Sequence, residues 1–147
     1  MIVVDTNVIA YLMIPGERSG GAQAVLRRDP DWQAPVLWRS EFRNVLVQQV
    51  RHGDMDEEVV YALMEKATEL MLGGEHEVAS EEVIRMALTS GASAYDSEFV
   101  VLARDLGVPL VTGDAKLKKA AASSVLSIDE FVGKRKQSPR RIPSSRR

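Results

Sequence analysis

Ile2-Val3-Val4-Asp5-Thr6-Asn7 is the stretch of this chain that says most about its architecture. Three β-branched apolar residues in a row are typical of a short buried strand, and Asp5 stands where such a strand would end. A second apolar run, residues 108–112, is followed two residues later by Asp114. Longer helical patterns separate these runs, so we predict an α/β fold with a central parallel sheet and helices on both of its faces.

The other elements follow from hydrophobic periodicity and from the glycines, prolines and capping residues that interrupt it. The predicted strands are residues 2–4, 33–36, 77–79, 108–112 and 125–127. The predicted helices are residues 7–13, 19–29, 37–52, 54–72, 80–90, 94–106, 115–121 and 128–132. We expect Ser80 and Ser93 to cap two of these helices, and Asp54 with Glu57 resembles a capping box that opens another.

The composition is that of a folded domain and excludes several kinds of active site. The chain has 147 residues, enough for one domain, of which 45% are hydrophobic and 27% charged. It contains no cysteine and only two histidines. A disulfide scaffold, a thiolate zinc site and a cysteine nucleophile are therefore excluded, and paired histidines have little to offer a mechanism. The start of the chain resembles neither a signal peptide nor a membrane span, so we expect a cytoplasmic protein without a membrane partner.

Charge is distributed unevenly along the chain. Residues 134–147 hold seven basic residues and no acid, which leaves 12 basic against 21 acidic residues, a net charge of −9, in residues 1–133. We expect residues 1–133 to form the domain and residues 134–147 to be a flexible basic tail. The tail is either a solubilising or vector-like extension, or a segment that attracts RNA or folds back on the acidic body.

Two acids are predicted to lie at one edge of the sheet. Asp5 and Asp114 each follow an apolar strand, and sites in open parallel sheets form beyond the carboxyl ends of strands. An aspartate between a strand and a helix is also a favoured helix cap. Capping explains each acid separately, but it does not predict further acids at the same edge.

Two more acids lie within apolar helical stripes. On the predicted helix 37–52, Glu41 falls between Leu37 and Val45 on the apolar arc, and on the helix 94–106, Asp96 falls between apolar positions as well. An ionised carboxylate in such a place needs a partner. For Glu41 the alternative to a cation site is a salt bridge with an arginine from another element. For Asp96 it is a capping box with Ser93.

Taken together, the four carboxylates Asp5, Glu41, Asp96 and Asp114 predict a metal site. Brought within about 5 Å of one another, they would repel by roughly 3 kcal/mol per pair at an effective dielectric of about 20. A divalent cation would compensate this repulsion. A set of oxygen ligands without thiols suits Mg²⁺ or Mn²⁺.

The ordered motifs resemble those of PIN-domain ribonucleases, especially the VapC-type toxins of toxin–antitoxin pairs. The resemblance runs from residue 1 to about residue 133 and rests on four stretches: Ile2-Val3-Val4-Asp5-Thr6-Asn7, Glu41, Tyr95-Asp96-Ser97 and Val111-Thr112-Gly113-Asp114. It implies that Asp5, Glu41, Asp96 and Asp114 are the catalytic and metal-binding acids. Supporting polar groups would be Thr6, Asn7 and Thr112.

The resemblance also implies a three-layer α/β/α sandwich, usually as a homodimer, with metal-dependent endonuclease action on RNA and a small antitoxin partner. Candidate apolar surfaces for the dimer are Met13, Ile14 and the helix 54–72. The acids would hold Mg²⁺ or Mn²⁺, with Glu41 binding through water or orienting the attacking water, and cleavage would leave a 5′-phosphate and a 3′-hydroxyl. Arg18, Arg39 and Arg43 are candidates for contacts with flanking phosphates.

Three other functions remain open at this point. The same fold could form a module that binds RNA or an antitoxin without cleaving. A phosphatase of the haloacid dehalogenase type would expect a second acid where this chain has Asn7. A response-regulator receiver would need adjacent acids after the first strand and a phosphorylatable aspartate at the end of a middle strand, whereas Asp54 follows Gly53 after a helix.

Overall fold

A parallel sheet of five strands lies at the centre of the computed structural model, which describes residues 1–121 and 124–133. The strand order is β3-β2-β1-β4-β5. The strands are β1 (Ile2–Val4), β2 (Trp32–Pro35), β3 (Glu75–His76), β4 (Leu110–Thr112) and β5 (Val125–Ser127). Every residue of β1, β2 and β4 is buried, as expected for strands covered by helices on both faces.

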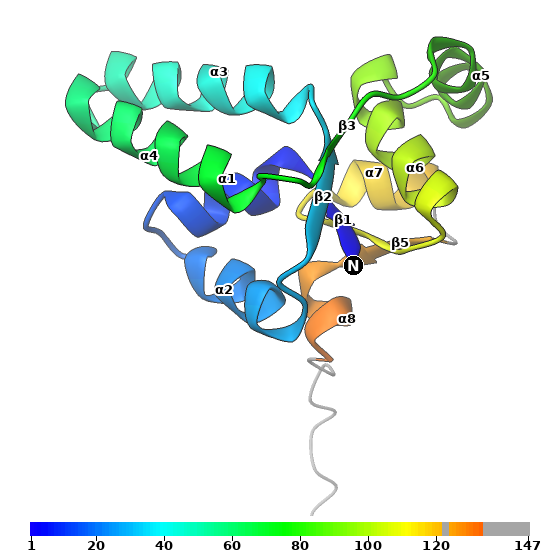
Figure 1. The fold of residues 1–147 in the computed structure, drawn as a ribbon, viewed down its shortest axis with the longest axis horizontal. Helices are drawn as coiled ribbons and strands as arrows, with labels where there is room; N and C mark the ends of the chain where they lie inside the picture. The colour runs from blue at the N-terminus through cyan, green and yellow to red at the C-terminus, as the bar shows by residue number, and fades with distance from the viewer. Residues whose placement is uncertain (122–123, 134–147) are drawn as a thin grey trace, which may run out of the picture.

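Helices cover both faces of this sheet (Figure 1). They are α1 (Thr6–Met13), α2 (Ser19–Arg28), α3 (Trp38–Arg51), α4 (Glu57–Leu70), α5 (Ser80–Ser90), α6 (Ala94–Leu106), α7 (Ala115–Ala120) and α8 (Ile128–Val132). In Figure 1, α1 to α4 lie on one side of the strands, and α5, α6 and α7 lie on the other. The predicted α/β/α sandwich with a parallel sheet is therefore confirmed.

The change of face has a topological cause. The first two connections step outward from β1 to β2 and from β2 to β3, whereas the third returns across the sheet to β4 on the other side of β1. Because parallel crossovers are right-handed, reversing the direction of travel places the helices on the opposite face. The carboxyl ends of β1 and β4 thus flank the switch point, where open α/β sheets form their binding sites.

Three local predictions are wrong. Asp54 does not open a helix: α4 begins at Glu57 after Asp56, and the Asp54 backbone N–H bonds to Gln49 in the turn that ends α3. Ser80 is the first residue of α5 rather than its cap. The strand predicted at residues 77–79 lies earlier, at β3, because Gly74 lets the chain pass against the Trp32 carbonyl, where a side chain would collide.

The end of the predicted domain coincides with the end of a helix. Gly133, with φ of 74°, closes α8 in the left-handed conformation that favours glycine. The basic segment 134–147 lies outside the described residues. Within residues 1–121 and 124–133, no helix combines the length and apolarity needed to cross a lipid bilayer.

Candidate active site

Asp5 is held at the carboxyl end of β1 by its neighbours in the sheet. Val4 pairs with Val111 across the β1–β4 ladder, so the next residues, Asp5 and Thr112, lie opposite each other. One carboxylate oxygen, Oδ2, accepts a hydrogen bond from the Thr112 hydroxyl. The other, Oδ1, accepts from the Val8 backbone N–H at 3.1 Å and so caps α1. Asp5 is therefore both a helix cap, as one interpretation of the sequence expects, and one of the acids at the carboxyl edge of the sheet.

Burial dominates the ionisation of Asp5. The residue is only 6% exposed, and its burial raises the pKa to about 6, against the opposing effect of the hydrogen bonds from Thr112 and Val8. The nearby negative charge of Asp114 is a smaller contribution to the same rise in pKa. The donors that reach Asp5 are a neutral hydroxyl and backbone amides, which offset the cost of burying a charge only in part.

Thr112 connects Asp5 to Asp114. While its hydroxyl donates to Asp5, the same oxygen accepts a hydrogen bond from the Asp114 backbone N–H at 2.9 Å. Asp114 in turn caps α7 by accepting from the Lys116 backbone N–H at 2.8 Å. One buried threonine thus fixes the relative positions of the two strand-end acids.

Glu41 reaches the same edge from the first turn of α3. Trp38, Phe42 and Leu46 of this helix are buried, and Glu41 lies half-buried on the same side, so the predicted acid within the apolar stripe is confirmed. Its partner is the Thr6 hydroxyl, which donates to Oε1 at 2.8 Å, and the predicted alternative of an arginine salt bridge is not found among the described residues. Burial raises the pKa of Glu41, and the charge of Asp96 adds to this effect.

Asp96 completes the set from the first turn of α6. The Ser93 hydroxyl caps this helix by accepting from the Asp96 backbone N–H at 3.0 Å, as the sequence predicts. The reciprocal half of the capping box, from the Asp96 side chain to the Ser93 backbone, is not among the described hydrogen bonds. Burial raises the pKa of Asp96, followed by the negative charge of Asp114.

The acids therefore interact in a row, Asp5 with Asp114, Asp114 with Asp96, and Asp96 with Glu41. Within the described ranges, none of the four forms a salt bridge with a lysine or arginine. The donor set, all oxygen and without a compensating cation, fits a hard divalent ion in chemistry and charge. No three acid or histidine side chains converge closely enough to hold one ion in this part of the chain. Asp5 and Asp114 each use one carboxylate oxygen, Oδ1, to cap a helix.

Of the remaining predicted site residues, Thr6 contacts one of the acids, and the others have different surroundings. Thr6 contacts Glu41, whereas Asn7 is exposed in the first turn of α1 and lines a small cavity between α1 and α3. Arg39 is not free for a phosphate: its guanidinium forms a bidentate ion pair with Glu75, at 2.5 and 2.8 Å. Arg43 is exposed beside the groove between α3 and α4.

Two features of the site were missed by the reasoning from sequence. Glu98, expected to be solvated, is half-buried, and its charge raises the pKa of Glu41. Arg18, a candidate phosphate contact, is attached to the site by bonds that the sequence does not predict: it donates to the Gly113 carbonyl at 3.3 Å and to the Tyr11 hydroxyl at 3.2 Å. The Val111-Thr112-Gly113-Asp114 motif contained the signal, because a glycine directly before a site acid indicates a close approach.

Comparison with known proteins places the chain in a family. A family model described as PIN domain matches residues 2–123. Ribonuclease VapC3 of Pyrobaculum aerophilum is 29% identical over 119 residues, which span 79% of this chain and 91% of that protein.

Solved structures share the fold. PAE2754 from Pyrobaculum aerophilum superposes with a TM-score of 0.72 at 20% identity and covers 90% of this chain and 86% of its own. A chain of a toxin–antitoxin complex from Klebsiella pneumoniae gives a TM-score of 0.60 at 15% identity, covering 87% of this chain and 98% of its own. At these identities the two structures bear on the fold alone.

Proposed function

The chain belongs to the PIN-domain family, and from this membership we propose that it is a divalent-metal-dependent endoribonuclease, the toxin of a toxin–antitoxin pair. A relative that matches over most of both chains is named a ribonuclease, and one structural neighbour belongs to a toxin–antitoxin complex. The substrate would be RNA, cut within the strand.

The observation that carries this proposal is the row of four carboxylates without a cation. Asp5, Asp114, Asp96 and Glu41 interact with one another, their described partners are neutral, and burial is the first cause of the raised pKa at Asp5, Asp96 and Glu41. A fold gains nothing in stability from such a row. A site that binds a cation from solution does need such a row of carboxylates. The ion would remove the repulsion between them, and a phosphate could then bind beside it.

We propose that Asp5, Asp96 and Asp114 hold the ion and that Glu41 contributes directly or through water. Bound there, Mg²⁺ or Mn²⁺ would supply a Lewis acid that stabilises negative charge on the phosphodiester and acidifies water. Thr112 holds Asp5 and the backbone of Asp114 in place.

Glu41 is suited to orient the attacking water. Thr6 occupies its Oε1, which leaves Oε2 to accept a hydrogen bond from water and receive its proton. In-line attack on phosphorus would then expel the 3′-oxygen, leaving a 5′-phosphate and a 3′-hydroxyl.

The test is cleavage of a pool of structured RNAs, with end-group analysis, by wild type and Asp5→Asn, with Mg²⁺ or Mn²⁺ and with EDTA. We expect metal-dependent cleavage by wild type only, with 5′-phosphate products. Cyclic-phosphate ends formed in EDTA would reject the metal mechanism. A protein that binds the pool but leaves it intact, equally well with either residue at position 5, would be the non-cleaving module.

The proposal extends to partners and to the tail. We propose a small antitoxin that blocks the acidic edge, a homodimer, and a domain of residues 1–133 followed by a tail, 134–147, that attracts RNA. Removing the tail should weaken RNA binding and flatten its salt dependence, because basic residues that contact phosphates release counterions. An unchanged affinity would leave the tail as a solubilising extension.

A further inference from the structure

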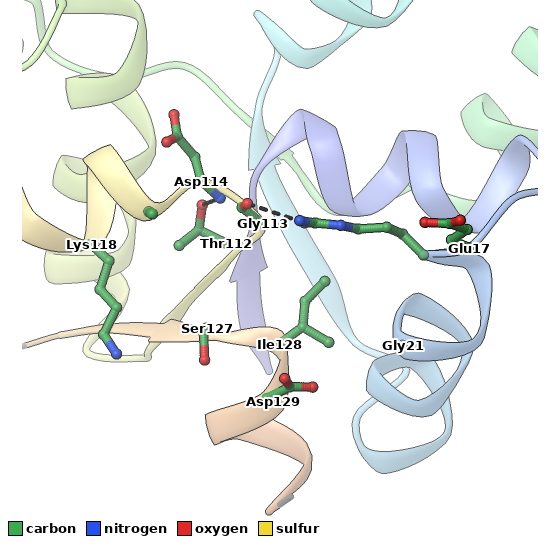
Figure 2. A pocket seen from close by; sticks show the side chains of 11 residues that line it. Glu17, Gly21, Thr112, Gly113, Asp114, Lys118, Ser127, Ile128 and Asp129 are labelled. Carbon is green, nitrogen blue, oxygen red and sulfur yellow. Dashed lines mark hydrogen bonds between the residues drawn. The ribbon is translucent and has the colours of Figure 1, made fainter. Parts of the chain in front are cut away.

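A cavity of about 500 Å³ lies beside Asp114, on the side of β4 that faces β5. Figure 2 shows Asp114 and Thr112 at its upper edge, Lys118 on one side and Glu17 on the other, with Ser127, Ile128 and Asp129 below. The cavity therefore adjoins the acidic edge, and its walls come from the α1–α2 connection, α7, and the junction of β5 with α8. A pocket of this size can take one unit of a small or polymeric ligand.

One wall carries an arginine whose position is fixed. The Arg18 guanidinium lies over the Tyr11 ring, 5.1 Å from its centroid, and one of its nitrogens, Nη1, donates to the Tyr11 hydroxyl and the Gly113 carbonyl. The last of these bonds is the dashed line at Gly113 in Figure 2. A Cβ at residue 113 would lie 2.6 Å from the Tyr11 ring, so glycine is required for this packing. Among the described residues, Nε and Nη2 of Arg18 have no hydrogen-bond partner, so they can donate to a phosphate next to Asp114.

The floor of the cavity offers a different chemistry. Lys118 is paired with Glu130, so its charge is already matched, and the Ser127 hydroxyl at the end of β5 accepts from the Glu130 backbone N–H. Asp129 is exposed, and its carboxylate has neither a salt bridge nor a side-chain hydrogen bond among the described residues. Beside it, Ile128 supplies an apolar surface. A carboxylate next to an apolar side chain suits a flat group that carries N–H donors rather than another phosphate.

We propose that this cavity binds the nucleotide next to the cleaved bond, and that Asp129 makes it selective for guanine. The inference rests on the proposed function. Arg18 contacts the phosphate of that nucleotide, the base packs on Ile128, and the Asp129 carboxylate accepts from N1–H and N2–H of the base. Guanine alone presents two adjacent N–H donors on its Watson–Crick edge, the edge that proteins read in unpaired RNA.

The phosphate contact is tested by binding, in an Asp5→Asn background and without divalent metal so that cleavage cannot intervene. The probe is short single-stranded RNA of random sequence, followed by fluorescence anisotropy over a range of salt. Arg18→Ala should weaken binding to the whole pool and lower the slope of log Kd against log salt by about 0.7, the value for one phosphate contact in a single strand. Arg18→Lys should restore the slope, which separates charge from packing on Tyr11.

The matched control for Arg18 is Arg27→Ala, an exposed arginine of α2 without a described ion pair. We expect it to leave the slope unchanged. If Arg18→Ala and Arg27→Ala behave alike, the phosphate contact does not exist and the proposed pocket is overturned.

The base contact is tested by selecting bound RNAs from the same pool and sequencing them. Guanine should be enriched about tenfold at one position, the discrimination expected of a bidentate contact, and Asp129→Asn should abolish that enrichment while overall affinity persists. Asp54→Asn, an exposed carboxylate in the turn before α4, is the control and should retain it. No enrichment, or enrichment that survives in Asp129→Asn, overturns the proposal.

These readouts do not depend on cleavage. If wild type cuts RNA but Arg18 and Asp129 behave like their controls, the pocket fails and the nuclease stands. If both residues behave as expected but wild type does not cut, the nuclease proposal fails and the pocket belongs to a binding module.

Discussion

Glu75 and Asp5 are carboxylates held by the same sheet in opposite electrostatic surroundings. Glu75, in β3, receives two hydrogen bonds from the Arg39 guanidinium and one from the Trp38 indole at 2.7 Å, and the bond from Arg39 lowers its pKa. Asp5, after β1, is more deeply buried but receives only neutral donors, and its pKa is raised to about 6. The two sites thus differ in burial and in the presence of a protein cation, which Glu75 has in Arg39 and Asp5 lacks among its described partners.

Under the proposed function, this difference separates a structural carboxylate, Glu75, from a carboxylate of the active site, Asp5. The Arg39–Glu75 pair joins the start of α3 to the edge strand β3, and its charges are matched within the protein, so it needs no ligand. Asp5 and the acids beside it are left unmatched at the topological switch point, where a binding site is expected. Charge without a partner at that position supports the proposal that a cation completes the site.

The largest expected effect is the loss of cleavage in Asp5→Asn. The amide keeps the size of the carboxylate and can still accept from the Val8 N–H, but it removes one charge of the proposed ion site. Cleavage of RNA under saturating Mg²⁺ should fall by at least 10²–10³-fold, the scale of removing one stabilising group from an active site. Glu75→Gln is the matched control and should cleave as wild type does. Equal losses in the two variants would erase the distinction between the two carboxylates.

The second effect is a pH dependence of stability that belongs to Asp5. Its folded pKa of about 6 exceeds the value of 3.8 expected in the unfolded chain, so its favourable contribution is fully present below about pH 4 and is lost as the pH rises through 6. The loss is about 3 kcal/mol. In urea unfolding with EDTA, the stability of Asp5→Asn relative to wild type should rise by this amount between about pH 3 and pH 7.5.

Glu75 supplies the opposite sign. Its folded pKa is lowered, so its contribution is present above the unfolded value of 4.5 and is lost as the pH falls through the folded pKa. The stability advantage of wild type over Glu75→Gln should therefore shrink in acid.

A stability difference between wild type and Asp5→Asn that does not vary with pH would contradict the raised pKa of Asp5. Glu41 and Asp96 also have a raised pKa, but both residues are present in wild type and in Asp5→Asn, so their own contributions cancel in the stability difference.

The comparison also indicates how far a sequence can lead. Most strands and helices followed from periodicity, which is a property of the local chain, although β3 and the start of α4 did not. The meeting of Asp5 with Asp114 followed from their places after parallel strands. The partner of Glu75 did not follow, because Arg39 reaches it across 36 residues and only the packing of α3 on β3 brings them together. The partner of Glu41 was equally hidden: the sequence left a cation site or an arginine open, and the structure places the Thr6 hydroxyl there.

Metal should stabilise wild type through the unmatched acids. Any ligand that binds only the folded state raises the free energy of unfolding, by about 3 kcal/mol at a hundredfold excess over Kd. Mg²⁺ or Mn²⁺ should therefore raise the unfolding midpoint of wild type and of Glu75→Gln, and much less that of Asp5→Asn. NaCl at equal ionic strength controls for screening. An equal response in all three proteins would mean that the ion does not bind at the acidic edge.

The smallest effect tests the matched site. The Trp38 side chain is fully buried, and its indole N–H has Glu75 as its acceptor, so Glu75→Ala leaves a buried donor without a partner and should cost about 1–3 kcal/mol of unfolding free energy. Glu75→Gln should lose less, because its amide oxygen can still accept from the indole. Urea unfolding near neutral pH measures both, with RNA cleavage as the second readout. Since Glu75 serves only the attachment of α3 to β3, residual folded Glu75→Ala should cleave at the wild-type rate, and a variant that is stable but inactive would place Glu75 in the active site instead.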